Sequence, residues 1–363
     1  MQLSLINNRQ YLSGKFRTLK IIMNVKHRWN VLVPYESIFL SNFLSTMINL
    51  GILSTARISR ALFQNPLKHS VITAVASRDM NKANMFADEY KILKRYGSYE
   101  ALLADKEIDA VYIGLPQHLH HRYVIEAANH GKHVLVEKPS ALSTQELLEM
   151  SEACKRNNVI YMEAFMYRFL GIHRRIKEVV NNGTIGELRY INFNFGFDIE
   201  RRGLTGFRRD RNLGGGALYD LGIYGIDFIR DILGKEPKLL HATVRREAQN
   251  GIDLFTHAVF QSENVIATLT CSFDMDGNYL SVSGRDGMLY SPLGTSGKQI
   301  PRVLHFHFID GEKETTEHFP SEDGYNAEVD YFAQCIERKE EPIPGMDNSL
   351  ANMKILEEIF TRG

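Results

Sequence analysis

The chain has 363 residues with 43 basic and 43 acidic side chains, and this zero net charge gives no support for a nucleic-acid or anionic-membrane partner. A hydrophobic content of 44% and a charged content of 24% are typical of a soluble globular protein long enough for two domains. Cys154, Cys271 and Cys335 are far apart and lack CxxC spacing, which argues against a disulfide framework or a zinc ribbon and indicates a cytoplasmic protein.

The first 46 residues are rich in basic side chains and show no regular hydrophobic periodicity. They lack the uninterrupted apolar core and the small-residue cleavage site of a signal peptide. We interpret 1–46 as an appended segment or an over-long reading frame, because Met47 stands where a compact domain would begin; the alternative is a functional extension. The most apolar candidate for a bilayer span, 38–53, is broken by polar residues, so no membrane partner is expected.

From residue 47 onward, short apolar runs alternate with helical patterns. The expected elements are a strand and tight turn at 47–55, a helix at 56–63, a strand at 70–77, a helix capped by Asp79 at 80–90, a short helix at 99–104, a strand at 110–115, a helix at 123–129 ending at Gly131, a strand at 132–137, a helix at 144–156 opened by a Ser143/Glu146 capping box, and a strand at 159–163. This alternation predicts an α/β fold with a doubly wound parallel sheet covered on both faces. Ligands of such sheets bind beyond the carboxyl ends of the strands, where the turn at 51–56, the segment 116–118 and Lys138 are expected.

The pattern changes after about residue 168. The expected elements are a helix at 173–181 ending at Gly183, a strand at 188–197, a loop rich in Arg and Gly at 201–215, a helix at 216–233, strands at 238–246, 254–260, 264–273, 278–283, 287–290 and 302–308, and helices at 325–338 and 349–361. Consecutive strands predict an α+β domain with a large, mostly antiparallel open sheet. We therefore expect a dinucleotide-binding domain at 47–168 and a substrate-binding and oligomerisation domain at 169–363, whose last helix could pack back on the first domain.

The first strand leads into a turn that occupies the place of a dinucleotide-binding fingerprint. Such turns need small residues so that backbone amides can approach a pyrophosphate. Ser54 and Ala56 stand where glycines are usual, so an ordinary strand–turn–helix is the alternative interpretation. The residues of this turn that we expect to bind a cofactor are Gly51, Ser54, Thr55, Ala56, Arg57 and Ile58.

The second strand ends at Ser77 and Arg78. An NAD-binding site would have an acidic residue here for the ribose hydroxyls. A hydroxyl and a guanidinium suit a 2′-phosphate, so NADP(H) is the expected cofactor and NAD(H) the second choice. The alternative for Arg78 is a solvated surface arginine.

Three side chains suggest proton chemistry. Lys138 ends a buried strand, and Asp220 and Tyr224 are four residues apart, which places them on one face of a helix. Gly222 and Gly225 in that helix each cost about 1 kcal/mol relative to alanine, which indicates close approach of another backbone or a ligand. An ammonium beside the phenol is expected to lower the pKa of Tyr224 and help it to shuttle a proton. The alternative is a core tyrosine and an ion-paired aspartate.

With these motifs in order, residues 47 to about 360 resemble the glucose–fructose oxidoreductase/inositol dehydrogenase family (Gfo/Idh/MocA). The similarity is to the branch with glucose–fructose oxidoreductase, dimeric dihydrodiol dehydrogenase and NADP-dependent D-xylose dehydrogenase. The motifs are Glu137-Lys138-Pro139, Pro116-Gln117-His118-Leu119-His120, Gly214-Gly215-Gly216-Ala217-Leu218-x-Asp220-x-Gly222-Ile223-Tyr224, 162–169 and 284–287. The departures from the family pattern are Ser54, Ala56, Leu115 and Gln117.

The resemblance implies a Rossmann domain and a second domain with an open sheet, through which homodimers or homotetramers form. It implies that Lys138 lies near both nicotinamide and substrate, often with a cis bond to Pro139. It also implies Tyr224 as the general acid/base beside Asp220, and His120 in the lining of the nicotinamide pocket. The further cofactor-binding residues are Leu115, Pro116, Glu137 and Lys138.

The histidines between 118 and 121 could suggest a metal, but no carboxylate or cysteine is spaced to complete tetrahedral ligation, so none is expected. The leading hypothesis is an NAD(P)-dependent dehydrogenase or reductase acting on a sugar, polyol or cyclic dihydrodiol. Lys138 and Tyr224 would handle the proton and Asp220 would orient them, with specificity in the loop 198–211. The rivals are a non-catalytic NADP-binding sensor or transcriptional co-regulator, and a structural Rossmann remnant that binds no cofactor.

Overall fold

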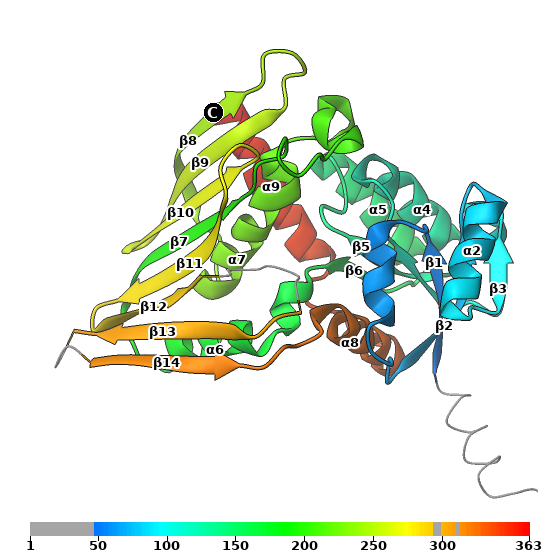
Figure 1. Cartoon of the computed structure of the whole chain (residues 1–363), viewed down its shortest axis with the longest axis horizontal. Coiled ribbons are helices and arrows are strands. Elements are labelled where there is room, and N and C mark those ends of the chain that lie inside the picture. The colour runs from blue at the N-terminus through cyan, green and yellow to red at the C-terminus, as the bar shows by residue number, and fades with distance from the viewer. Residues whose placement is uncertain (1–46, 293–298, 310–312) are drawn as a thin grey trace, which may run out of the picture. The chain divides into compact units, whose positions relative to one another are not determined.

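The computed structural model of the chain describes residues 47–292, 299–309 and 313–363 (Figure 1). The extension expected at 1–46 lies outside these residues. Ile48–Gly363 form one compact unit built on two sheets, and the division into domains at 168 stays a prediction. Within the described ranges, no helix is both long and apolar enough to cross a membrane.

The first half contains a six-stranded sheet, sheet A, with the order β3-β2-β1-β4-β5-β6 and only parallel pairings. Its strands are β1 (Ile48–Leu53), β2 (Ser70–Ala76), β3 (Lys94–Tyr96), β4 (Ala110–Ile113), β5 (His133–Glu137) and β6 (Tyr161–Ala164). Every residue of β4 and β6 is buried, as expected for central strands covered on both faces. The strand order reverses between β1 and β4, which confirms the predicted doubly wound sheet.

The helical elements of the first half are η1 (Arg57–Phe63), α2 (Met80–Tyr90), α3 (Tyr99–Leu103), η2 (Gln117–Leu119), α4 (His120–Asn129), α5 (Thr144–Arg156) and η3 (Met166–Phe169). The side chain of Asp79 caps α2 as predicted. At the start of α5, the Ser143 hydroxyl accepts from the Glu146 N–H, but the Glu146 carboxylate accepts from the N–H of Leu142. The predicted capping box therefore closes one residue earlier than the pattern requires.

The second half contains an eight-stranded sheet, sheet B, in the order β14-β13-β12-β11-β7-β10-β9-β8. Its strands are β7 (Leu188–Gly196), β8 (Lys238–Arg246), β9 (Asp253–Ser262), β10 (Val265–Ser272), β11 (Gly277–Gly284), β12 (Gly287–Ser291), β13 (Arg302–Phe308) and β14 (Lys313–Phe319). Only β7 and β10 pair in parallel, so the predicted mostly antiparallel sheet is confirmed. The edge strand β14 was not expected, because its sequence KETTEHF is largely polar.

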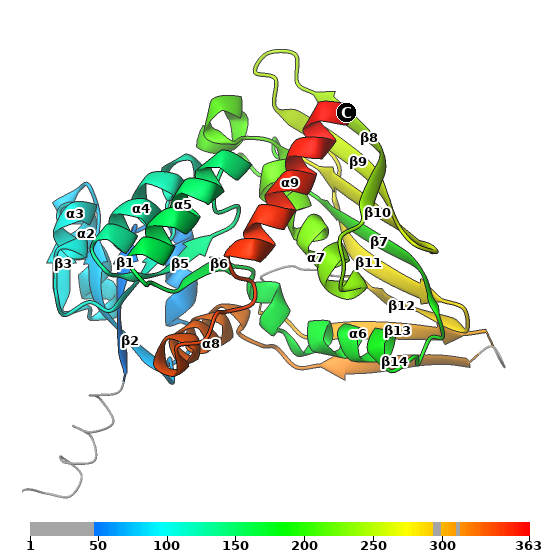
Figure 2. The same cartoon turned by 180° about the vertical axis from the view of Figure 1, so that it is seen from behind.

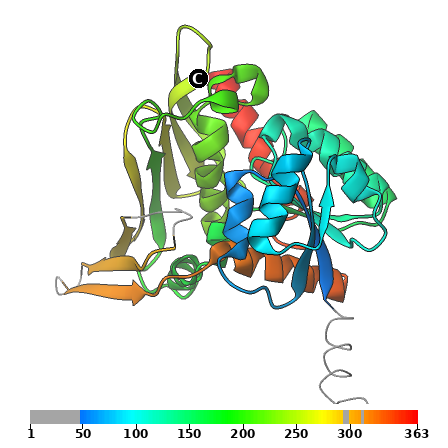
Figure 3. The same ribbon diagram turned by 45° about the vertical axis from the view of Figure 1, so that its right-hand side comes forward.

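The helical elements of the second half are α6 (Gly171–Asn181), η4 (Gly206–Arg209), η5 (Arg211–Leu213), η6 (Leu218–Gly222), α7 (Ile223–Leu233), α8 (Gly324–Arg338) and α9 (Met346–Arg362). The helix expected at 216–233 is interrupted, because η6 is a π turn that precedes α7. Helices α6, α7 and α9 contact sheet B, and α9, in red, also contacts α5 and β6 of the first half (Figures 2 and 3). Helix α8 packs against η1, η3 and β5.

Candidate active site

The carboxyl edge of sheet A is where the predicted site residues meet. Ser54 follows β1, Leu115 lies two residues after β4, and Lys138 follows β5 directly. Because β1 and β4 flank the point where the strand order reverses, this edge is the expected ligand crevice of a doubly wound sheet. The segment 214–224 of the second half approaches the same edge. Gln117 donates a hydrogen bond to the carbonyl of Gly214, and Tyr219 donates to the carbonyl of Leu142 at 2.7 Å.

Lys138 and Asp220 join the two halves of the molecule. The Lys138 Nζ lies 2.7 Å from the main-chain carbonyl oxygen of Asp220 and 3.2 Å from its Oδ1. Each side chain is only 11% exposed, so water screens this ion pair weakly. The Lys138–Pro139 peptide bond is cis, as the resemblance implies.

Asp220 has a second cationic partner that the sequence did not reveal. Its Oδ2 accepts a hydrogen bond of 2.8 Å from Nε of Arg208, whose side chain is 31% exposed. Burial raises the pKa of Asp220, but the charges of Lys138 and Arg208 outweigh it and hold the pKa at about 2. The carboxylate is therefore ionised at neutral pH. The only signal for Arg208 in the sequence was its position in an arginine-rich loop just before the glycine run.

Tyr224 lies beneath the Lys138 ammonium, which is 4.5 Å from the centre of the phenol ring and in the geometry of a cation–π contact. Its side chain is buried, and its hydroxyl has no hydrogen-bond partner among the described residues. Burial, followed by the negative charge of nearby groups such as Glu137 and Asp220, raises the pKa of Tyr224 well above its ordinary value. The prediction that the ammonium lowers this pKa is therefore wrong, because the ammonium contacts the ring face and burial dominates.

The two glycines noted in this helix pack against sheet B and not against a ligand. A Cβ at Gly222 would lie 2.9 Å from the Sγ of Cys271, and a Cβ at Gly225 would lie 2.6 Å from the Phe193 ring. The groups that approach these glycines are side chains, where another backbone or a ligand was expected. The helix needs glycine here because it lies directly on the strands.

Two buried hydrogen bonds hold the residues next to Lys138. The Glu163 carboxylate accepts a hydrogen bond of 3.0 Å from the backbone N–H of Ser140, and Tyr112 donates to Glu137 at 2.7 Å. Glu163 was not predicted as a site residue, because a single acidic residue in the segment 162–169 carried no signal of its own. These contacts hold the backbone of Ser140 and the side chain of Glu137, on either side of Lys138.

His120 is buried between the loops that follow β4 and β5. It is 1% exposed, with Nδ1 2.9 Å from the Pro139 carbonyl oxygen and Nε2 2.8 Å from that of Leu115. Burial lowers its pKa to about 4, so the ring is neutral and only one of its two nitrogens can donate. Its ring connects the loops after β4 and β5, and the expectation that His120 lines the nicotinamide pocket stays a prediction.

The turn after β1 has a conformation that favours glycine but is built with serine. Ser54 has φ = 135°, and its hydroxyl accepts a hydrogen bond of 2.9 Å from the N–H of Ala56. Arg57–Phe63 then begins without a side-chain cap. Thr55, Ala56 and Ile58 are partly exposed and Arg57 is exposed, but Gly51 is buried, where a Cβ would lie 2.7 Å from a methyl of Leu102. Gly51 thus serves the packing of β1 on α3.

At the end of β2, Ser77 is buried and Arg78 is exposed. The nearest carboxylate in sequence, Asp79, accepts from the N–H groups of Asn81 and Lys82 as the cap of α2. Burial raises the pKa of Tyr99, and the adjacent Arg78 guanidinium opposes that rise. The strand end therefore offers a hydroxyl and a cation, while its one acid is engaged in capping.

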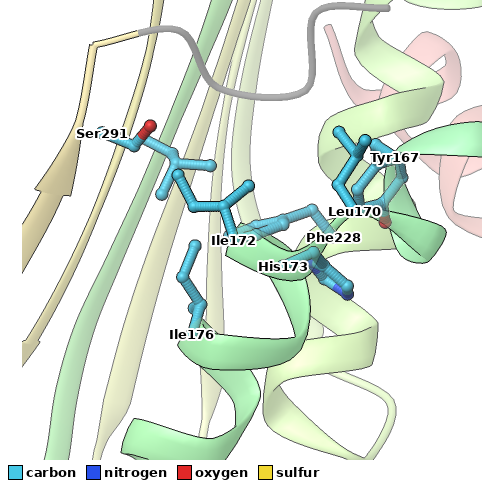
Figure 4. Close-up of a pocket in the computed structure, with 8 residues that line it drawn as sticks. Tyr167, Leu170, Ile172, His173, Ile176, Phe228 and Ser291 are labelled. Atoms are coloured by element: carbon cyan, nitrogen blue, oxygen red, sulfur yellow. The ribbon is translucent and has the colours of Figure 1, made fainter. Parts of the chain in front are cut away.

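Two other features are separate from this crevice. His118, His120 and His121 have different surroundings, and the described ranges hold no cluster of three or more His, Cys, Asp or Glu side chains arranged for a metal. A small, largely apolar hollow between α6, α7 and sheet B contains none of the predicted site residues (Figure 4). It is lined by Tyr167, Leu170, Ile172, His173, Ile176, Phe228, Leu280 and Ser291.

A doubly wound sheet with a lysine, an aspartate and a tyrosine close together beyond the carboxyl ends of its strands is typical of dinucleotide-dependent oxidoreductases. Family models agree with this class. The model described as "Oxidoreductase family, NAD-binding Rossmann fold" matches residues 48–165, and the "GFO/IDH/MocA C-terminal domain" model matches 173–290.

The chain is 35% identical to D-xylose 1-dehydrogenase (NADP(+)) 2 of Haloferax volcanii, over 79% of this chain and 88% of that protein. It is 31% identical to trans-1,2-dihydrobenzene-1,2-diol dehydrogenase of Xenopus laevis, over 85% and 96%. A solved 3-ketoreductase from Actinomadura kijaniata, in complex with NADP and TDP-benzene, superposes with a TM-score of 0.79 at 26% identity, covering 87% and 98% of the two chains. The chain belongs to the Gfo/Idh/MocA oxidoreductase family and is an NAD(P)-dependent oxidoreductase acting on CH–OH groups.

Proposed function

We propose that this oxidoreductase prefers NADP(H) and acts on a sugar, a polyol or a cyclic dihydrodiol, with Lys138 and Tyr224 handling the proton and Asp220 orienting them. The observation that carries the proposal is the position of the Lys138 ammonium, 2.7 Å from the Asp220 carbonyl oxygen and 4.5 Å from the centre of the Tyr224 ring. The substrate class is supported by relatives that are named as dehydrogenases of D-xylose and of a dihydrodiol.

The chemistry divides between the cofactor and the protein. Nicotinamide, when bound, supplies or accepts the hydride at the carbinol carbon. The high pKa keeps Tyr224 protonated, so in the direction of reduction its hydroxyl can donate a proton to the developing alkoxide. Lys138 and Arg208 together carry more positive charge than Asp220 neutralises, and this surplus stabilises the phenolate that remains. Oxidation uses the same groups in reverse.

The residues present fit an NADP-type cofactor. The uncapped amides after Ala56 suit a pyrophosphate, and Ser77 and Arg78 suit a 2′-phosphate, while Asp79 is already engaged as a helix cap. Ser77→Asp should shift the preference toward NAD, because a carboxylate accepts from ribose hydroxyls and repels a phosphate. Equal kcat/KM with NADP before and after this change would contradict the assignment.

The test of the function is a screen for NADP reduction with D-xylose, D-glucose, inositols and trans-dihydrodiols, and for NADPH oxidation by the matching carbonyl compounds. We expect turnover with at least one member of the panel, and loss of that turnover in Tyr224→Phe. NADPH binding, followed by fluorescence, without oxidation by any carbonyl compound would overturn the proposal in favour of a sensor.

We also propose that the chain forms a homodimer or homotetramer through the face of sheet B opposite the helices, and that it works in the cytoplasm. A row of aromatic rings on neighbouring strands supports the interface: Tyr290 lies 6.1 Å from Tyr279 and 6.2 Å from His305, centre to centre. The location is supported by three buried, unpaired cysteines, which suit a reducing compartment. Light scattering on the full chain tests the assembly, since a monomer would contradict it.

A further inference from the structure

The segment that carries Asp220 and Tyr224 has an irregular first turn. Ala217 is α-helical, Leu218–Gly222 then form a π turn, and the regular α-helix runs from Ile223. A π turn holds one residue more than an α turn, and such turns are frequent at functional sites. Because each residue of an α-helix advances by about 100°, losing the extra residue would rotate Asp220 relative to Tyr224 by about that angle. The relative orientation of Asp220 and Tyr224 therefore depends on a contact that stabilises the π turn.

The group that does so comes from a distant strand. Asp253, the first residue of β9, is 2% exposed, and its Oδ2 accepts a hydrogen bond of 2.7 Å from the backbone N–H of Leu218. The same oxygen accepts from the hydroxyl of Thr256 at 3.0 Å. The first N–H groups of a helix have no partner within it, and a carboxylate placed there stabilises the turn that follows. The bonded amide is two residues from Asp220.

The glycines at 214–216, just before this turn, include one that leaves room for the Asp253 carboxylate. Gly216 has φ = 121°, and an added Cβ would overlap the Asp253 Oδ1. That oxygen is buried and has no hydrogen-bond partner among the described residues. A buried carboxylate oxygen without a partner costs free energy, and a well-packed apolar side chain would avoid that cost. The stability of sheet B alone therefore does not explain an acid at this position.

We propose that Asp253 is a positioning residue for the reaction: it holds the π turn that presents the Asp220 carbonyl and carboxylate to Lys138. This inference rests on the proposed function of Lys138, Asp220 and Tyr224. Asp253 acts through Leu218 and does not contact the reacting groups itself. Misplacing such groups by about 1 Å can cost on the order of 10²-fold in rate.

The experiment compares Asp253→Ala, Asp253→Asn and Thr256→Val in the full chain, using NADP and the panel substrate that wild type turns over fastest. Asp253→Ala should lower kcat by roughly 10- to 100-fold, with the Kd for NADPH within about twofold of wild type. Asp253→Asn should recover much of kcat, because its amide oxygen can still accept from Leu218. Thr256→Val removes the other hydrogen bond to this carboxylate and should change kcat by less than about threefold.

Several results would overturn the inference. These are an Asp253→Ala variant with near-normal kcat, equal losses in NADPH affinity and kcat, or a Thr256→Val loss as large as that of Asp253→Ala. If Asp253→Ala does not fold, Asp253→Leu, which fills the site but removes the acceptor for the Leu218 N–H, takes its place, and a near-normal kcat in that variant would overturn the inference. If wild type turns over no substrate, the proposed function fails, and a crystal structure of Asp253→Ala decides the inference. An unchanged contact between Lys138 Nζ and the Asp220 carbonyl would refute it, and a broken contact would support it.

Discussion

Two groups of charged side chains lie along the same helical segment, 218–233, and they differ in what their hydrogen bonds leave open. The site cluster consists of Lys138, Asp220 and Arg208, which are 11%, 11% and 31% exposed. The core cluster consists of Arg168, Asp227 and Asp231, which are 8%, 0% and 9% exposed. Both combine buried aspartates with cations, and both lie beside a tyrosine.

The core cluster uses nearly all of its hydrogen-bonding capacity. Asp227 accepts from Tyr167 at 2.5 Å, from Arg168 at 2.7 and 2.8 Å, and from Asn348 and Asn352 at 2.7 and 3.0 Å. Those donors come from η3 and α9, so the cluster connects three helical elements around one buried carboxylate. Such a network has a structural role and no free group for a substrate.

The site cluster has unused capacity instead. The Tyr224 hydroxyl has no hydrogen-bond partner among the described residues, and Arg208 donates only its Nε to Asp220. A substrate hydroxyl would complete both groups. If the site cluster carries the proposed chemistry, it differs from the core cluster in that Arg208 and Tyr224, beside its ion pair, keep hydrogen-bonding groups for a ligand. Burial alone, or an ion pair alone, occurs in both clusters.

The largest expected effect comes from breaking the core cluster. Asp227→Ala should lower the free energy of unfolding by about 3–5 kcal/mol, because it leaves the buried Arg168 guanidinium with Asp231 as its one carboxylate partner and removes the acceptor of the Tyr167, Asn348 and Asn352 hydrogen bonds. Chemical denaturation of the full chain measures this. The control is Asp276→Ala, which breaks a surface pair with Arg201 and should cost less than about 1 kcal/mol. If Asp227→Ala lowered the free energy of unfolding by less than about 1 kcal/mol, the core cluster would not have the structural role assigned to it.

Lys138→Ala should lower kcat on the order of 10²-fold or more while leaving the folded protein intact, because it removes the group that stabilises proton transfer. The matched control is Lys177→Ala, since Lys177 also binds an aspartate of this segment, Asp231 at 2.9 Å, but belongs to the core side. Its kcat should stay within about twofold of wild type. Similar losses in both variants would mean that the two clusters do not differ in function.

The sequence predicted the members of the site cluster better than the buried acids that hydrogen-bond to the segments carrying them, Glu163 and Asp253. Lys138, Asp220 and Tyr224 carry local signals, namely a strand end before proline and a four-residue helical spacing. Glu163 and Asp253 lie in strands, where one acid among apolar residues looks the same whether it faces water or a buried amide.

The electrostatics of the site were harder to predict than its members. The pKa of Tyr224 was predicted in the wrong direction because the sequence places a lysine nearby but cannot show that the ring is buried and that carboxylates surround it. The fold was accessible because the alternation of strands and helices directly reflects burial on both faces of sheet A. Only β14, whose polar sequence lacks that signal, was missed among the strands of sheet B.

Glu163 interacts with both clusters. Its carboxylate accepts a hydrogen bond from the Ser140 N–H, two residues after Lys138, and the negative charge of Asp227 contributes to raising its pKa. Burial, the main cause, raises its pKa from 4.5 to about 7, so the folded chain holds a proton that the unfolded chain has released. The resulting stability is fully present below pH 4.5 and is lost as the pH rises through about 7.

We therefore expect wild type to lose about 2 kcal/mol more stability than Glu163→Gln between about pH 5 and 8. Denaturation at several pH values measures the difference. Glu178→Gln, at an exposed position on α6, should follow wild type. Parallel pH profiles for wild type and Glu163→Gln would show that Glu163 is ionised throughout.

The smallest effect is expected at the exposed end of the site cluster. Arg208→Gln should lower kcat/KM by about tenfold, because Lys138 still holds Asp220 while the positive surplus that stabilises the oxyanion is lost. Stability should change by less than about 1 kcal/mol, since Arg208 forms a partly exposed pair. Arg201→Gln, in the same loop but 77% exposed, should leave both quantities unchanged. If Arg208→Gln instead destabilised the fold and spared kcat/KM, Arg208 would belong with Arg168 as a structural cation, and unfilled hydrogen bonds would no longer distinguish the two clusters.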